Sequence, residues 1–190
     1  MNVFALHQHP IAAAKMHCDK HVVKMILETA QLLSTAHRML DGKLEKRDSV
    51  SGKTKTKYWV LEESNMENVL YRATMMNHPC AIWIRETDAN YMWAYNLFVG
   101  LCDEYTHRYG KVHKTDTLLR DALMFTPQNI KRAGLTKFPQ AMPEDVKHED
   151  SIVAYRQYYL KYKSDFAKWT KREVPLWYDE VHGTNACYAS

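Results

Sequence analysis

Glycine and proline are scarce in this sequence, with six of each among 190 residues. Both residues interrupt helices, so their scarcity favours long helices and disfavours a sheet of many strands, which needs many turns. It also disfavours the glycine-rich loops that hold nucleotide phosphates, because those loops need several glycines at fixed spacing. The sequence has no internal repeat and no low-complexity tract.

Long apolar runs are also missing. No stretch approaches the roughly 18 apolar residues that a transmembrane helix needs, and the first residues lack the basic segment of a secretory signal. The four cysteines (Cys18, Cys80, Cys102 and Cys187) form no Cys-x-x-Cys pair, which predicts free thiols rather than a disulfide framework. We therefore expect no membrane partner and a cytoplasmic location.

The composition is that of a folded chain, 46% hydrophobic and 25% charged, with a formal net charge of only +4. Residues 42–57 alone carry an equal positive excess. The charged residues of this segment are Lys43, Lys46, Arg47, Lys53, Lys55 and Lys57 against Glu45 and Asp48. We interpret the segment as a loop that is either solvated or in contact with phosphates.

Helical spacing of apolar residues covers most of the remaining chain. Helices are expected over residues 11–40, 61–76, 80–109, 116–124 and 150–170. Pro10 suits the first turn of the first helix, Gly42 a left-handed cap at its end, and Asp150 the cap of the last helix. The sequence thus predicts an all-α fold: a compact single domain over residues 1–178, built from about three main helices, and a C-terminal tail over 179–190.

The most specific motif lies in the expected first helix. Asp19-x-His21 is followed seven residues after the histidine by Glu28, and Asn77-His78-Pro79 precedes Trp83 further along the chain. This combination resembles the endonuclease V type of pyrimidine-dimer DNA glycosylases and their phage and bacterial relatives. The resemblance covers most of the chain loosely and about thirty residues specifically.

In that family, the free N-terminal amine attacks the sugar and a single glutamate acts on the intermediates. By position, the resemblance implies that Glu28 is the glutamate and that His21 lies beside it. Asn2 is too large for ordinary removal of the preceding methionine, so Met1 is expected to remain and to carry the amine. An amine nucleophile must be neutral, and α-amino groups in general titrate near pH 8, far below lysine. Asn77 and His78 are further expected members of the site.

The resemblance also implies double-stranded DNA as the partner and no cofactor; for a phage-encoded chain the location would be the host cytoplasm. Leu27 and Gln31 stand where the family has arginines beside the glutamate, so DNA contacts are expected from other basic residues. These are Lys20, Lys24, Arg38, Lys53, Lys55, Lys57, Lys168 and Arg172. Basic side chains beside Trp169 and Trp177 suit phosphate neutralisation combined with base stacking.

Other interpretations fit the same residues. His17 and His21 are four apart on a helix, with Glu28 on roughly the same face, which is a spacing that a zinc or iron site would use. The chain could instead be a non-catalytic helical module that binds nucleic acid or protein through residues 42–57. Glu28 could serve only as an ion-pair partner of His21, Lys24 or His78, and the aromatic residues of the later helices are expected mainly in the core.

Overall fold

The computed structural model describes residues 1–48, 52–62 and 65–183. The α-helices are α1 (Pro10–Met16), α2 (Asp19–Asp41), α3 (Pro79–Ile84), α4 (Asp88–Tyr109), α5 (Lys114–Leu119), α6 (Ser151–Tyr162) and α7 (Leu176–His182). Short 3-10 turns lie at Asn65–Asn68, Glu144–Val146 and Ser164–Phe166, and the strands are β1 (Lys43–Asp48) and β2 (Lys55–Val60). No helix in these described ranges is both long and apolar enough to span a membrane.

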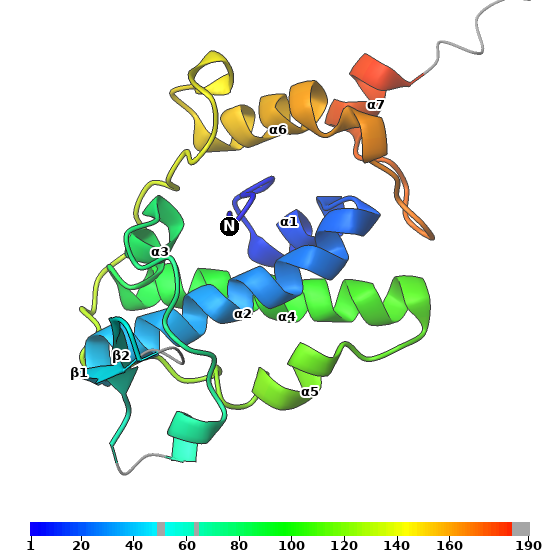
Figure 1. The fold of residues 1–190 in the computed structure, drawn as a ribbon. Helices are drawn as coiled ribbons and strands as arrows, with labels where there is room; N and C mark the ends of the chain where they lie inside the picture. Colours follow the sequence, from blue (N-terminus) through cyan, green and yellow to red (C-terminus); the bar gives the residue numbers. More distant parts are fainter. Residues whose placement is uncertain (49–51, 63–64, 184–190) are drawn as a thin grey trace, which may run out of the picture.

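Two long helices, α2 and α4, lie side by side across the molecule, and α1 packs on α4 (Figure 1). The α1–α4 contact depends on Gly100, where a Cβ atom would lie 2.9 Å from the Cβ of Ala14. The aromatic residues of α4 and α6 are largely buried, as expected; the innermost are Tyr91, Phe98, Tyr155 and Tyr159. Cys18, Cys80 and Cys102 are buried free thiols, while Cys187 lies outside the described residues.

The prediction of an all-α fold is wrong, because the basic segment forms a two-stranded antiparallel sheet at the end of α2. β1 and β2 pair from Lys43 opposite Val60 to Asp48 opposite Lys55. The fold is therefore mixed, mostly helical with one hairpin. The charge of this segment indicated a loop, but the run from Lys55 to Val60 also holds threonine, tyrosine, tryptophan and valine, which favour strands.

Two expected helices are divided. The first is interrupted at His17–Cys18, where the side chain of Arg108 donates hydrogen bonds to the carbonyl oxygens of Lys15 and His17 and so replaces helical partners. The second is interrupted at residues 85–87, and Thr87 caps α4 by accepting a hydrogen bond from the Asn90 amide. At the first break, the hydrogen bonds come from Arg108, which is distant in the sequence. Only the second break is marked by a local residue, the capping Thr87.

The expected helix over residues 61–76 does not form in the described part of that range, which is irregular apart from one 3-10 turn. The guanidinium of Arg38 takes the carbonyl oxygens of Trp59, Glu67, Leu70 and Tyr71 as acceptors. Because these carbonyls bond to an arginine of α2, the segment lies along that helix without forming one of its own.

Several helix ends follow the sequence. Pro10 begins α1, Asp150 caps α6 and Gly110 ends α4 in the left-handed conformation. Gly42 does end α2, but with an extended backbone; a glycine fits there because a Cβ would lie 2.4 Å from the Arg38 carbonyl oxygen.

The C-terminal part differs from the prediction at both of its boundaries. Helix α6 stops at Tyr162 rather than near residue 170. Residues 179–182, expected in the tail, belong to α7, and residues 184–190 of that tail lie outside the described residues.

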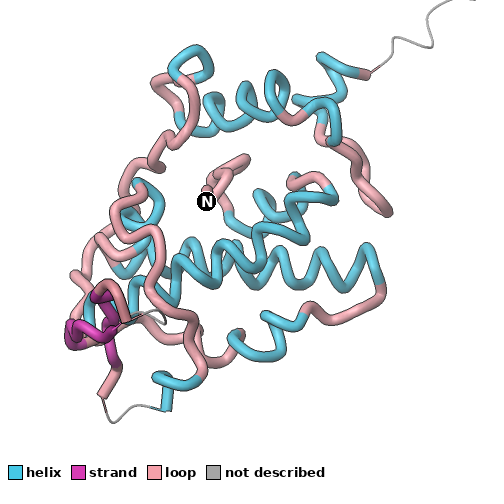
Figure 2. The backbone as a smooth tube through the Cα atoms, viewed as in Figure 1, coloured by secondary structure: helices cyan, strands magenta, loops and turns pink. Residues whose placement is uncertain are grey.

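A long irregular stretch connects α5 to α6 and runs up one side of the molecule (Figure 2). It is fixed to the helices by side-chain hydrogen bonds. The carboxylate of Asp41 accepts from the amides of Gln128 and Asn129, and that of Asp88 accepts from the amide of Ala133. The stretch thereby brings residues 138–141 next to the N-terminal segment.

The N-terminal segment lies between α2 and α6 (Figure 1). Val3, Ala5 and Leu6 have no exposed surface, and the Phe4 ring contacts rings of both helices. Chain ends usually fray unless they are tied down. Here the first residues are part of the core, which fixes the position of the α-amino group.

Candidate functional site

The α-amino group of Met1 lies beside the carboxylate of Glu28, with 3.8 Å between the nitrogen and Oε2. The other oxygen of Glu28 lies 3.3 Å from Nζ of Lys24, one turn earlier in α2. Only 14% of the Glu28 side chain is exposed, whereas 68% of Lys24 is. One half-buried carboxylate is thus shared by two amines, of which the α-amino group is the more enclosed.

Asn2 holds this terminus in place. Its side-chain amide donates to the carbonyl of Ala141 at 2.9 Å, and its Oδ1 accepts from the Val3 amide at 2.9 Å. The hydroxyl of Tyr155 lies 2.7 Å from the same oxygen and 2.6 Å from the carbonyl of Pro139, and its single proton serves one of these acceptors. Contacts from α6 and from residues 139–141 therefore set the direction in which Met1 points.

His78 approaches the same place from the start of α3. Its Nδ1 accepts a hydrogen bond from the Cys80 amide at 3.2 Å, so the neutral ring carries its proton on Nε2. Burial lowers the pKa of His78 and the positive charge of the N-terminus lowers it further, while the negative charge of Glu28 opposes both. The imidazole is held in its neutral form within the field of the amine and the carboxylate. Asn77, in the preceding turn, is exposed.

The group formed by the Met1 amine, Glu28, Asn2 and His78 is called the amino-terminal site below. It supplies a primary amine, a carboxylate next to it and a neutral imidazole, contributed by the N-terminal segment, α2 and the start of α3. A primary amine can add to a carbonyl carbon, and a carboxylate can stabilise the resulting cation and move protons. The site therefore contains the groups that imine chemistry needs.

His21 does not belong to the amino-terminal site, although the sequence placed it beside Glu28. Its ring is buried and its Nδ1 lies 2.5 Å from the hydroxyl of Tyr159. Burial, together with the positive charges of nearby residues, lowers the pKa of His21 to about 3. A neutral histidine packed against Phe4 and Phe166 serves the core of the protein.

The structure does not assemble the alternative metal site. His17 bonds through Nδ1 to the carbonyl of Ala13, and the centres of the His17 and His21 rings lie 6.4 Å apart. Glu28 is engaged with Met1 and Lys24 instead. Within residues 1–48, 52–62 and 65–183, no group of three or more His, Cys, Asp or Glu side chains is arranged to hold a metal ion.

Six of the basic residues expected to contact DNA are exposed, although three of them have partners. Lys24 pairs with Glu28, Lys55 lies 3.6 Å from Asp48, and Lys20 sits over the ring of Phe166. The other exposed residues are Lys53, Lys57 and Lys168. Their side chains remain available to an anionic partner.

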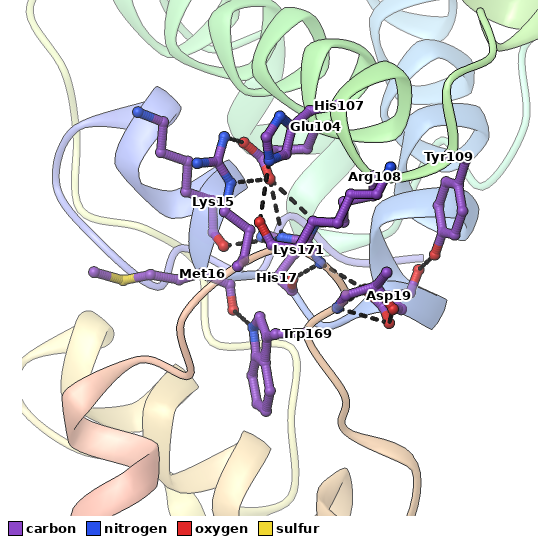
Figure 3. Close-up of polar contacts among 12 residues, drawn as sticks. Lys15, Met16, His17, Asp19, Glu104, His107, Arg108, Tyr109, Trp169 and Lys171 are labelled. Carbon is purple, nitrogen blue, oxygen red and sulfur yellow. Dashed lines mark hydrogen bonds and ion pairs between the residues drawn. The ribbon is translucent and has the colours of Figure 1, made fainter.

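The other two residues expected to contact DNA, Arg38 and Arg172, have carboxylate partners within the protein. Arg38 is 4% exposed and is bonded to four carbonyl oxygens and to Glu67. Arg172 forms two hydrogen bonds to Glu104, at 2.9 and 2.7 Å. Glu104 also pairs with the buried Arg108, and Figure 3 shows Arg108 between Glu104 and Asp19. Arg38 is therefore buried within the fold, whereas Arg172 is paired with Glu104 and keeps 31% of its side chain exposed.

Sequence reasoning missed Tyr155, which holds Asn2, because no local pattern relates residues 153 positions apart. It also missed the Glu104–Arg108 pair, although a spacing of four on a helix is a recognisable signal for such a pair. Comparison with known protein families, with curated proteins and with solved structures finds no match to this chain.

Proposed function

We propose that the protein acts on damaged or abasic double-stranded DNA through an imine formed by the Met1 amine, with Glu28 as the assisting carboxylate. The observation that supports this function is the approach of the α-amino nitrogen to within 3.8 Å of a half-buried carboxylate. The resemblance of the Asp19–Glu28 and Asn77–Trp83 segments to endonuclease V-type glycosylases supports the same function independently of that distance.

The chemistry can be written for an abasic site, whose open sugar carries an aldehyde at C1′. The amine of Met1, after losing a proton, adds to C1′, and loss of water leaves an iminium ion. Glu28 stabilises that positive charge and then removes a proton from C2′, so that the C3′–O bond breaks and the 3′ phosphate leaves. Water hydrolyses the imine and regenerates the amine. On a nucleotide that still carries its base, attack at C1′ displaces the base, which leaves with a proton.

His78 contributes to the same site as a neutral group. Its Nε2–H is a hydrogen-bond donor and carries no positive charge, because burial and the N-terminus lower the pKa of the ring. It can therefore donate a hydrogen bond to a sugar or phosphate oxygen without adding a second cation beside the forming iminium ion.

Borohydride reduction of the protein mixed with an abasic duplex tests this function. We expect a covalent protein–DNA species, because reduction converts the imine to a stable amine. A variant with several residues added before Met1 should give none, since its amine no longer lies beside Glu28. Glu28→Gln keeps the shape of the side chain. It should slow cleavage of the abasic duplex by about 100-fold, which is within the usual range for loss of a proton-transfer group.

Lys24→Gln is the matched control, because it removes the other amine beside Glu28 and leaves Met1 unchanged. It should still give the covalent species. Absence of that species with abasic and base-damaged duplexes, while DNA binding persists in the wild type and in Glu28→Gln, would contradict the enzymatic function and favour a non-catalytic DNA-binding module.

A further inference from the structure

A pocket of about 360 Å³ lies between strand β2 and the irregular segment that Arg38 holds against α2. Its lining includes Arg47, Lys57, Tyr58, Glu67 and Arg72. The pocket exists because the hairpin and residues 67–73 both meet the end of α2, and no local pattern relates these two parts of the chain.

The electrostatics of this pocket favour an anion. The carboxylate of Glu67 already accepts hydrogen bonds from Arg38 at 2.6 Å and from the Leu61 amide at 2.8 Å. Arg47 pairs with Glu45 of its own strand. Among the residues that the structure describes, Lys57 and Arg72 have no carboxylate partner. The cations lining the pocket therefore exceed the negative charge available to balance them.

Tyr58 positions two of the three arginines that line the pocket, Arg47 and Arg72. The guanidinium carbons of Arg47 and Arg72 lie 5.2 and 5.0 Å from the centre of its ring, within the range of cation–π attraction. The hydroxyl of Tyr58 accepts a long hydrogen bond of 3.4 Å from Arg72. Part of each guanidinium edge is used, because Arg47 also bonds to Glu45 and Arg72 to the Tyr58 hydroxyl. The remaining N–H groups of the two edges match the oxygen atoms of a phosphate.

The pocket is connected to the amino-terminal site by the segment from Arg72 to His78. Thr35 of α2 holds this segment midway, because its hydroxyl accepts from the Thr74 amide at 3.1 Å and donates to the Gln31 carbonyl. Glu28 and Arg38 are ten residues apart on α2, which is about 15 Å along the axis. Successive phosphates of one strand are spaced about 3.4 Å along a duplex, so this separation corresponds to roughly four nucleotides.

We propose that the Arg47–Lys57–Arg72 pocket binds a backbone phosphate of the DNA, roughly four nucleotides from the sugar that reaches Met1. The assignment of DNA rests on the proposed function; the preference for a phosphate group rests on the pocket itself. A free nucleotide or inorganic phosphate presents the same chemistry, and the experiment below separates these sources.

The test compares two triple variants in binding an undamaged duplex between 50 and 200 mM salt. The first replaces Arg47, Lys57 and Arg72 with glutamine. The second replaces the exposed Lys111, Lys114 and Lys171, near the far end of α4, and so removes the same charge. Each phosphate contact contributes about 0.9 to the slope of log affinity against log salt. We expect the pocket variant to lower that slope by about one and the affinity by about 10-fold, and the control variant to leave the slope unchanged.

Equal slopes for the two triple variants, or no change in either, would overturn the proposal. So would saturable NMR shifts at the hairpin with a mononucleotide or inorganic phosphate but none with duplex DNA. Binding to undamaged DNA involves no imine, so the two proposals fail separately. A lowered slope without borohydride trapping supports the pocket against the Met1 chemistry, and trapping with an unchanged slope does the reverse.

Discussion

Replacing Arg108 with methionine is expected to lower the free energy of unfolding by about 3–5 kcal/mol, the usual cost of removing one member of a buried ion pair. The Arg108 side chain has no exposed surface. It bonds to Glu104 at 3.1 Å, to Asp19 at 2.9 Å and to the carbonyls of Lys15 and His17. Methionine has a similar length but no donor, so these carbonyls and part of the negative charge would stay buried without partners.

Arg120→Met is the matched control for this change. Arg120 also bonds to two carboxylates, those of Asp116 and Asp103, but 33% of its side chain is exposed. Solvent reaches Arg120 and Asp103 and screens their pair, although the Asp116 side chain is only 9% exposed. The expected loss is therefore smaller than that of Arg108→Met. Urea unfolding followed by circular dichroism measures both variants. Similar losses for the two would show that the Arg108 cluster does not secure the junction between α1, α2 and α4.

Acidification from pH 6 to pH 4 is expected to destabilise the protein steeply. Burial lowers the pKa values of three histidines: His17 to about 4, His21 to about 3 and His37 to about 4. The unfolded chain binds protons at these residues below about pH 6.5, whereas the folded protein does not until near pH 4. Their stabilising contribution is therefore complete above pH 6.5 and is lost as the pH falls. Three protons correspond to about 4 kcal/mol per pH unit.

Urea unfolding at pH 7, 6 and 5 measures this dependence. His37→Gln should reduce the slope of stability against pH by about one third, whatever its effect on stability at pH 7. A substitution of the exposed His107 should leave the slope as it is in the wild type. An unchanged slope in His37→Gln would mean that His37 becomes protonated in the folded state as readily as in the unfolded chain.

The parts of the fold that the sequence predicted are those with local signals. Pro10 and Asp150 each set a helix start, and Gly110 sets the end expected at residue 109; these three ends are confirmed. The breaks and irregular segments depend instead on distant arginines. Arg108 donates a hydrogen bond to the carbonyl oxygen of His17 where the helix is interrupted. Arg38 bonds to carbonyl oxygens of residues 67–71 and so holds them in a non-helical path. Periodicity along the chain contains no information about such contacts.

The hairpin and the candidate site illustrate the same difference. The net charge of residues 42–57 led to the prediction of a loop, although the side chains of β2 favour a strand. In contrast, the approach of Met1, Glu28 and His78 was expected only because two short motifs resemble those of endonuclease V-type glycosylases. What no pattern contained was the role of α6 and residues 139–141 in anchoring Asn2. The exclusion of His21 from the site follows from packing alone, since Tyr159 and Phe166 enclose its ring.

The position of the covalent bond in the borohydride-reduced protein–DNA species shows whether Met1 is the nucleophile. Two amines lie beside Glu28, so digestion of that species and mass spectrometry of its peptides separates them. We expect a peptide that begins with Met1 and carries the deoxyribose fragment on its α-amino nitrogen. A fragment attached to Lys24 or to another lysine, with an unmodified Met1 peptide, would contradict it.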